Sequence, residues 1–422
     1  METLRFDELQ LDERILRAVA DMGFEEASPI QAQAIPVQME GRDIIGQAQT
    51  GTGKTAAFGI PLLQKVDPKS KKLQAIALCP TRELAIQVAD EIRRLAKYMH
   101  GVKVLPIYGG QDIVKQIRSL KDGTQIIIGT PGRLLDHCNR NSLDLSNVKR
   151  VIVDEADQML QAGFLEDIDM LISMTPKSRQ LLFFSATIPD KIRNLAKKHM
   201  TNPLVLNVRE GETIALETIE QRIYMVSEEH KLDLLCRMLT DMNPYLAIVF
   251  CNTKERTSIL ASDLIARGFN IGELHGDMSQ GRRTQVLRDF AKAKTQILVA
   301  TDIAARGIDI EGITHVFSYD VPHDVDYYIH RIGRTGRAGS EGLAIMFATA
   351  ADETWVRRIE HNIQATITKY AANGQVRVKA ANTAPKRKKV FKDKLPASTY
   401  QATKSKRHKT LHKGGDNRRR RK

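Results

Sequence analysis

The chain has 422 residues, which is too long for one ordinary domain and predicts two domains with a tail. Hydrophobic residues make up 42% and charged residues 27%, which supports packed cores, and the net charge is +14. The cysteines, at positions 79, 138, 236 and 251, form no Cys-x-x-Cys pair, which argues against a zinc site or a disulfide framework.

The pattern of apolar residues argues against two further classes of protein. The first residues, Met1–Glu8, include acidic side chains and no apolar core, so we expect no signal peptide here. No stretch of the chain is long and apolar enough to span a bilayer. We therefore expect a cytoplasmic protein that does not associate with a membrane.

The first chemical motif is a glycine-rich loop, Ala48-Gln49-Thr50-Gly51-Thr52-Gly53-Lys54-Thr55. It follows a short strand pattern at Asp43–Gly46 and precedes a helical pattern. Such glycines let backbone N–H groups face phosphate oxygens, so that Lys54 can reach the β- and γ-phosphates and the Thr55 hydroxyl can bind Mg²⁺. Ala48 replaces the usual glycine, but the other glycines remain. A simple turn is the alternative, and the order strand, loop, helix disfavours it.

Short apolar runs then alternate with amphipathic stretches. The runs Leu73–Cys79, Gln125–Gly129, Val151–Asp154 and Leu181–Ser185 predict buried parallel strands, each followed by a polar turn. Helical spacing fills the gaps, as at Leu84, Val88, Ile92 and Leu95. This alternation is typical of an α/β fold with a parallel sheet and helices on both faces.

A second acidic motif completes the predicted nucleotide site. The apolar strand Val151–Asp154 ends in a carboxylate that would hold Mg²⁺, usually through water. Glu155 follows immediately and can orient or deprotonate an attacking water. An ordinary acidic helix start is the alternative, because carboxylates favour that end of the helix dipole. The phosphate loop upstream weakens that alternative.

The strand pattern restarts after a linker. The second set of expected strands is Leu246–Cys251, Ile271–His275, Gln296–Ala300, His315–Tyr319 and Gly342–Ala348. Between the two sets, Asn202–Thr218 shows no clear period. We therefore expect an N-terminal domain over residues 1–205, a linker over 206–217 and a second domain over 218–370. Ligands of such sheets bind outside the carboxyl ends of the strands.

The last segment, residues 371–422, carries the excess charge. It holds 18 Lys and Arg against 2 Asp and Glu, a net of +16, which leaves −2 for residues 1–370. Blocks of like charge repel, so we expect disorder. We favour an RNA-tethering role, because releasing counterions from phosphates favours binding. Contact with a protein partner, or mere solubilisation, are the alternatives.

The motifs together resemble those of the DEAD-box RNA helicases, named for the tetrapeptide that stands here at Asp154–Asp157. The other family motifs of the first domain are Gly23-Phe24, Ser28–Gln31, Pro80–Ala85, Gly109-Gly110, Thr130–Arg133 and Ser185–Thr187. Those of the second domain are Val249–Thr253, Gln280–Arg283, Ala300–Asp302, Arg306–Asp309 and His330–Arg337. The resemblance covers residues 4 to about 350, and within it residues 4–32 resemble the glutamine motif. Ala27-Ser28 replaces the usual Pro-Thr there, but Ser28 keeps a hydroxyl.

The resemblance implies two tandem RecA-like domains with ATP and Mg²⁺ in the cleft between them. Nucleotide contacts are implied for Phe24, Gln31, Ala48, Gln49, Thr50, Gly51, Thr52, Gly53, Lys54, Thr55, Gly307 and Asp309. Metal contacts are implied for Thr55 and Asp154. Hydrolysis and its coupling are implied for Lys54, Asp154, Glu155, Ser185, Thr187, His330, Arg334 and Arg337.

The chemistry of these side chains agrees with those roles. The Gln31 carboxamide offers the donor and acceptor that match the adenine edge, and Phe24 would stack on the base, although a phenylalanine alone is more often a core residue. Arg334 and Arg337 resemble arginine fingers, whose planar guanidinium stabilises charge on a transferring phosphoryl group. A solvated basic helix start is the alternative for these arginines.

RNA contacts are implied across both domains, at Thr81, Arg82, Gly110, Thr130, Arg133, Gln280, Arg283, Thr301 and Asp302. These side chains are small, polar or basic, which suits backbone contacts better than base readout. The family preference for RNA comes through ribose 2′-OH contacts and duplex shape. A bent bound strand would open nearby base pairs locally.

The expected activity is that of an RNA-dependent ATPase that unwinds short duplexes. An ATP-gated RNA clamp, an ATP-independent annealing chaperone acting through the tail, and a DNA helicase are the alternatives. Ribosome assembly, mRNA decay and cold adaptation or stress response all fit the family, with proteins of RNA decay or ribosome assembly as candidate partners. We expect a monomer, because no zipper-like heptad repeat is present near the tail.

Overall fold

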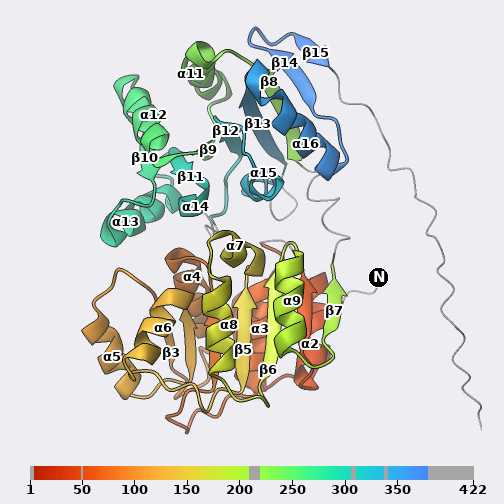
Figure 1. Cartoon of the computed structure of the whole chain (residues 1–422), viewed down its shortest axis with the longest axis vertical. Helices are drawn as coiled ribbons and strands as arrows, with labels where there is room; N and C mark the ends of the chain where they lie inside the picture. The colour runs from red at the N-terminus through yellow and green to blue at the C-terminus, as the bar shows by residue number, and fades with distance from the viewer. Residues whose placement is uncertain (1–3, 49–50, 209–218, 306–309, 337–340, 379–422) are drawn as a thin grey trace, which may run out of the picture. The chain divides into compact units, whose positions relative to one another are not determined.

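The structure is a computed structural model that describes residues 4–48, 51–208, 219–305, 310–336 and 341–378 (Figure 1). The predicted disordered tail therefore lies outside the described residues from 379 onward. Within the described ranges, no helix has both the length and the apolar character that crossing a membrane requires.

The first domain is built on a parallel sheet in the order β3-β4-β2-β5-β6-β1-β7. Its strands are β1 (Ile44–Gln47), β2 (Ala75–Leu78), β3 (Val104–Ile107), β4 (Ile126–Gly129), β5 (Arg150–Asp154), β6 (Gln180–Ser185) and β7 (Leu204–Asn207). The central strands are buried along their whole length, which explains their continuous apolar runs.

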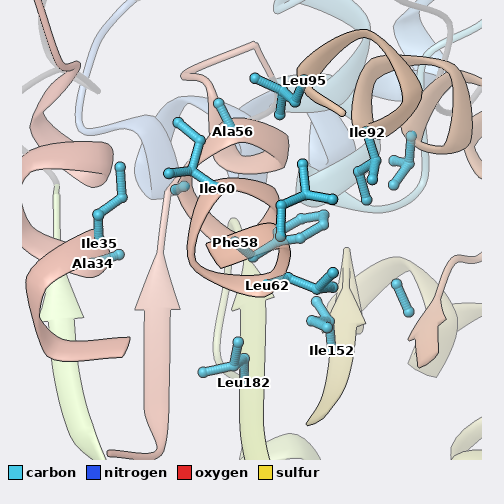
Figure 2. Close-up of a cluster of buried hydrophobic side chains, with 14 of the residues drawn as sticks. Ala34, Ile35, Ala56, Phe58, Ile60, Leu62, Ile92, Leu95, Ile152 and Leu182 are labelled. Atoms are coloured by element: carbon cyan, nitrogen blue, oxygen red, sulfur yellow. The ribbon is translucent and has the colours of Figure 1, made fainter. Parts of the chain in front are cut away.

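Helices cover both faces of this sheet, as predicted. They are α1 (Glu13–Asp21), α2 (Pro29–Met39), α3 (Lys54–Gln64), α4 (Arg82–Leu95), α5 (Ile113–Lys121), α6 (Pro131–Asn139), α7 (Ala156–Gln161), α8 (Leu165–Ser173) and α9 (Asp190–His199). Successive strand side chains alternate between two cores, so that Ile152 joins the core of α1–α4 while Val151 and Val153 join that of α6–α9. Figure 2 shows the first core, in which Phe58 of α3 lies over Ile152 and Leu182.

The second domain repeats the plan with the strand order β10-β11-β9-β12-β13-β8-β14-β15. Its strands are β8 (Ile219–Met225), β9 (Ala247–Cys251), β10 (Ile271–Leu274), β11 (Ile297–Thr301), β12 (His315–Ser318), β13 (Gly342–Ala348), β14 (Thr368–Ala371) and β15 (Val376–Val378). Its helices are α11 (Lys231–Met242), α12 (Lys254–Ala266), α13 (Gln280–Ala291), α14 (Asp302–Ala305), α15 (Val325–Ile332) and α16 (Glu353–Ile363). Helices α11 and α12 pack on one face, and α13–α16 on the other.

Two boundaries differ from the sequence prediction. The predicted unstructured stretch from Asn202 begins with β7, which pairs with β1 at the sheet edge and leaves Val205 60% exposed. The second sheet also continues past residue 370 into β15, which pairs antiparallel with β14. Edge strands need only one apolar face, so their short runs give a weak sequence signal. Residues 209–218, within the predicted linker, lie outside the described residues.

Candidate active site

The phosphate loop connects the carboxyl end of β1 to the start of α3. Gly51 and Gly53 have φ angles of 87° and 86°, a backbone conformation that favours glycine. Lys54, the first residue of α3, is only 5% exposed. Gln49 and Thr50, predicted to belong to the same loop, lie outside the described residues. The local geometry is that of a loop that presents a helix N-terminus to an anion.

A buried ion pair joins the loop to the second acidic motif. Lys54 Nζ lies 2.7 Å from Glu155 Oε1 and donates to the Ala48 carbonyl at 3.1 Å. Burial disfavours the Lys54 ammonium, but the carboxylates of Glu155 and Asp154 outweigh it and raise its pKa. The two motifs, 101 residues apart in sequence, thus form one charged cluster.

Asp154 lies at the end of β5 beside this pair and is 3% exposed. Burial raises the pKa of Asp154 to about 7; the Lys54 charge opposes this shift and Glu155 adds to it. Within the described part of the chain, Asp154 Oδ1 is buried without a hydrogen-bond partner. A buried carboxylate oxygen without a partner is costly, so the site is suited to a cation that arrives with a ligand.

The glutamine motif holds the phosphate loop in place. Ser28 Oγ donates to the Thr52 carbonyl at 2.8 Å, and Gln31 Nε2 donates to the Gly53 carbonyl at 3.1 Å. A Cβ at Gly53 would collide with the Gln31 amide, so this approach requires glycine. In this state, therefore, the Gln31 carboxamide that was predicted to bind adenine bonds to the loop.

Phe24, the predicted stacking residue, is partly buried. Its ring stacks on that of Phe6, with the centroids 6.4 Å apart. It also packs against the core of the first domain. Phe24 therefore also acts as a core residue in this structure, in line with the alternative interpretation of this phenylalanine.

The Ser185–Thr187 motif of the first domain bonds directly to the acidic motif. Asp157 Oδ2 accepts from the backbone N–H of Thr187 at 2.8 Å and from its hydroxyl at 3.0 Å. Ser185 Oγ, which is fully buried, accepts from the backbone N–H of Asp157 at 3.0 Å. A shift at Asp157 would therefore move Ser185–Thr187.

In the second domain, the arginine-rich motif lies on and just after α15. Arg334 is 3% exposed, and its Nε donates to the His330 carbonyl at 3.1 Å. Both residues line a small cavity, whose other lining residues are Phe250, Asp302, Ala305, Tyr327 and Arg331. Arg337, Gly307 and Asp309 lie outside the described residues.

Arg331 is a site residue that the sequence analysis left without a role. It is 1% exposed and donates to both carboxylate oxygens of Asp302, at 2.6 and 2.7 Å. It also donates to the Asp320 carbonyl and to Asn252 Oδ1. The Asp302 side chain, predicted to contact RNA, is therefore engaged within the domain, and Arg331 is what ties together the second-domain motifs. Its place inside the His330–Arg337 motif was the available signal.

Many of the predicted RNA contacts lie around one groove of about 470 Å³. Of the predicted residues, the groove is lined by Thr81, Arg82, Thr130, Arg133 and Arg283. Gly110 and Gln280 both approach Arg82: a Cβ at Gly110 would collide with its guanidinium, and Gln280 Oε1 accepts from it at 3.3 Å. Thr301 and Asp302 are not among the lining residues. Phe164, Asp136 and Ile303 line the groove and were not predicted.

Arg283 is paired with an acidic residue of the Pro80–Ala85 motif. Its Nε donates to Glu83 Oε1 at 2.8 Å, and its other nitrogens donate to the His275 and Ala304 carbonyls. Both side chains of this ion pair are below 10% exposed. Arg283 is therefore positioned by internal contacts, as Arg82 is.

Comparison with known proteins agrees with this geometry. Residues 28–195 match the DEAD/DEAH box helicase family and residues 230–339 match the helicase conserved C-terminal domain. The ATP-dependent RNA helicase CshA of Listeria monocytogenes is 49% identical over 381 residues, which cover 89% of this chain and 73% of that protein. The DEAD-box ATP-dependent RNA helicase CshA of Bacillus subtilis is 50% identical over 358 residues, covering 85% and 72%.

Solved structures give the same result. Dbp5 of S. cerevisiae, bound to RNA and ADP BeF3, matches with a TM-score of 0.79 and 33% identity, over 87% of this chain and 96% of that one. DEAD-box helicase Mss116 bound to ssRNA and UDP-BeF matches with a TM-score of 0.80, at 30% identity, over 88% and 80%. The predicted tandem RecA-like fold is confirmed. The chain belongs to the DEAD-box family of ATP-dependent RNA helicases.

Proposed function

We propose that this protein opens short RNA duplexes locally, binding RNA with ATP and releasing it after hydrolysis. The observation that carries the proposal is the buried cluster of Lys54, Asp154 and Glu155. In this cluster a direct hydrogen bond between Lys54 and Glu155 joins the phosphate-binding motif to the acidic motif. Such a cluster fits phosphoryl transfer, in which positioning and charge stabilisation supply most of the catalysis.

Nucleotide binding would rearrange this cluster. In the described state Lys54 and Glu155 satisfy each other's charge. Phosphate oxygens would replace Glu155 as the partner of Lys54, which leaves the Glu155 carboxylate to orient and deprotonate the attacking water. The ion pair therefore keeps the catalytic base occupied until ATP arrives.

The residues present also fit a magnesium ion. Asp154 and the Thr55 hydroxyl would hold it, with water and phosphate oxygens as the remaining ligands, because Mg²⁺ usually keeps few protein ligands. The described residues contain no cluster of three or more His, Cys, Asp or Glu that would hold a metal alone. The ion would neutralise charge that develops on the phosphates. The buried Asp154 Oδ1, which has no hydrogen-bond partner among the described residues, fits a contact with such an ion.

The second domain would complete the site when it closes on ATP. Arg334 and Arg337 would contact the γ-phosphate, Gly307 and Asp309 the ribose, and Phe24 and Gln31 the adenine. His330 would link this domain to Asp157 and thereby to Ser185 and Thr187. Loss of the γ-phosphate removes contacts that favour the closed state, so hydrolysis shifts the equilibrium towards release.

RNA would bind along the groove lined by Arg82, Arg133 and Arg283. Thr81, Gly110, Thr130 and Gln280 would add backbone and 2′-OH contacts there, while Thr301 and Asp302, which do not line the groove, would contact RNA outside it. The basic segment 371–422 would hold structured RNA near the groove by raising its effective concentration. We further propose a monomeric, cytoplasmic protein with roles in ribosome assembly, mRNA decay or cold adaptation, where proteins of these processes are its partners.

The proposal is tested by ATPase assays with RNA and with DNA of the same sequence. We expect single-stranded RNA to stimulate hydrolysis and DNA to have little effect, because the contacts include the 2′-OH. A truncated chain of residues 1–378 should need more RNA for half-maximal stimulation and reach the same maximal rate.

Two outcomes would contradict it. Equal stimulation by DNA would indicate a DNA helicase or a general nucleic-acid ATPase. Strand annealing that does not depend on ATP and is lost in the 1–378 chain would indicate a chaperone that acts through its basic segment.

A further inference from the structure

A buried polar cluster lies behind Arg133, one of the residues that line the RNA groove. Gln116 of α5 and His137 of α6 are 4% and 0% exposed. Gln116 Oε1 lies 3.0 Å from Arg133 Nε and 2.9 Å from His137 Nε2. On the far side of the imidazole, His137 Nδ1 lies 2.8 Å from the Ser142 hydroxyl. These contacts form a continuous chain from the domain interior to the groove.

The Gln116 carboxamide is held in one orientation by four partners. Its nitrogen donates to the Tyr108 carbonyl at 3.1 Å and to Gln111 Oε1 at 3.0 Å. Its oxygen therefore has to accept from both Arg133 and His137, which uses its two lone pairs. A carboxamide with all four hydrogen bonds made has no alternative rotamer of equal energy.

The same argument fixes the tautomer of His137. Since Gln116 presents an oxygen, His137 Nε2 carries the proton and donates it, while the Ser142 hydroxyl lies 2.8 Å from Nδ1 and 3.0 Å from the His137 carbonyl. Burial, followed by the Arg133 charge, lowers the pKa of His137, so the ring stays neutral. The imidazole is therefore a fixed donor.

Arg133 itself is restrained along its guanidinium. Besides Nε on Gln116, Nη2 donates to the Gln111 carbonyl and Nη1 donates to Asp136 Oδ2 at 3.4 Å. The side chain remains 16% exposed and lines the groove. One edge of the guanidinium group is thus held by hydrogen bonds to the protein. A planar guanidinium that is held in this way loses little conformational freedom when it binds a phosphate.

We propose that His137 and Gln116 are positioning residues for RNA binding: they hold Arg133 in the orientation in which it contacts the RNA backbone. This inference rests on the proposed role of Arg133 in the groove. His137 is not among the residues that line the groove, and its effect passes through Gln116. Loss of the His137 donor would leave one lone pair of a buried oxygen unsatisfied and free the carboxamide to rotate away from Arg133.

The first test compares His137→Leu, which removes the donor, with His137→Gln, whose amide nitrogen can replace imidazole Nε2. His137→Leu should raise the RNA concentration for half-maximal ATPase stimulation about tenfold, the size expected when a hydrogen bond to a charged group is disturbed. The maximal rate at saturating RNA should stay within about twofold, and His137→Gln should restore most of the affinity. His315→Leu is the matched control, because it removes a half-buried histidine from β12, away from Arg133.

A double-mutant cycle separates positioning from general destabilisation. In the Arg133→Ala background, His137→Leu should change the half-maximal RNA concentration less than twofold, since the residue it positions is absent. A thermal melt with its midpoint well above the assay temperature confirms that each variant is folded. A tenfold effect that persists without Arg133, or a fall in maximal rate with unchanged RNA affinity, overturns the inference. If Arg133→Ala alone leaves RNA affinity unchanged, the proposed role of Arg133 in the groove fails first.

Discussion

Glu155→Gln is expected to reduce RNA-stimulated ATP hydrolysis by a factor of about 10²–10⁴, the usual contribution of a general base. The substituted carboxamide still accepts a hydrogen bond from Lys54, so the buried contact at 2.7 Å keeps a partner of the same shape. Asp154 continues to offset the Lys54 charge. ATP and RNA should therefore bind together and dissociate slowly. Steady-state hydrolysis and co-binding of labelled ATP and RNA measure the two effects.

Glu166→Gln is the matched control for this change. Glu166 lies exposed in the first turn of α8 in the same domain, so its substitution removes the same charge without touching the cluster. It should leave turnover within about twofold, as expected of surface substitutions. Full activity in Glu155→Gln would contradict the assignment of the base. Loss of ATP binding in that variant would show instead that Glu155 supports the site structurally.

Arg331→Met is expected to lower the free energy of unfolding of the second domain by about 3–5 kcal/mol, because it breaks a buried ion pair and leaves Asp302 without its partner. The Asp320 carbonyl and Asn252 Oδ1 also lose a donor. The aliphatic chain of methionine fills much of the same volume, so a cavity contributes little. Denaturant unfolding measures the change, and RNA-stimulated hydrolysis should fall with it, since this network positions α14 and α15.

Arg357→Met tests whether that effect is specific to the buried network. Arg357 pairs with Glu353 one turn away on the surface of α16, and its side chain is 73% exposed. Exposed pairs contribute about 0–1 kcal/mol, so this variant should unfold nearly as the parent does. Equal destabilisation by the two substitutions would show that Arg331 has no special structural role.

Sequence reasoning identified the parts of the fold whose signal is local. Continuous apolar runs marked β2, β4, β5 and β6, because strands buried on both faces need no polar alternation. The edge strands β7 and β15, and β14 between β8 and β15, were not predicted, because their runs are short and Val205 and Val376 are 60% and 46% exposed. Strand β8 lies at the start of the predicted second domain, after an irregular stretch, and was not among its predicted strands.

The parts of the site that consist of contiguous sequence motifs were predictable. The loop at Lys54 and the acidic pair after β5 were found in this way, but their direct ion pair depends on the folded sheet. The hydrogen bond from Gln31 to Gly53 was not predictable. A family motif indicates which ligand a residue binds, but it does not indicate the contact that the residue makes when the ligand is absent. His137 and Gln116 lie 21 positions apart on different helices, so only the structure shows that they meet.

The measurement that tests the account most directly is the unwinding of a short RNA duplex by the intact chain, with and without ATP. Unwinding should require ATP, and its rate should fall steeply as the duplex lengthens, because opening is local and needs no travel along the strand. Glu155→Gln should show at most a single round of opening, since release requires hydrolysis. Unwinding without nucleotide, or a rate that is independent of duplex length, would contradict local ATP-driven opening by the Lys54–Glu155 site.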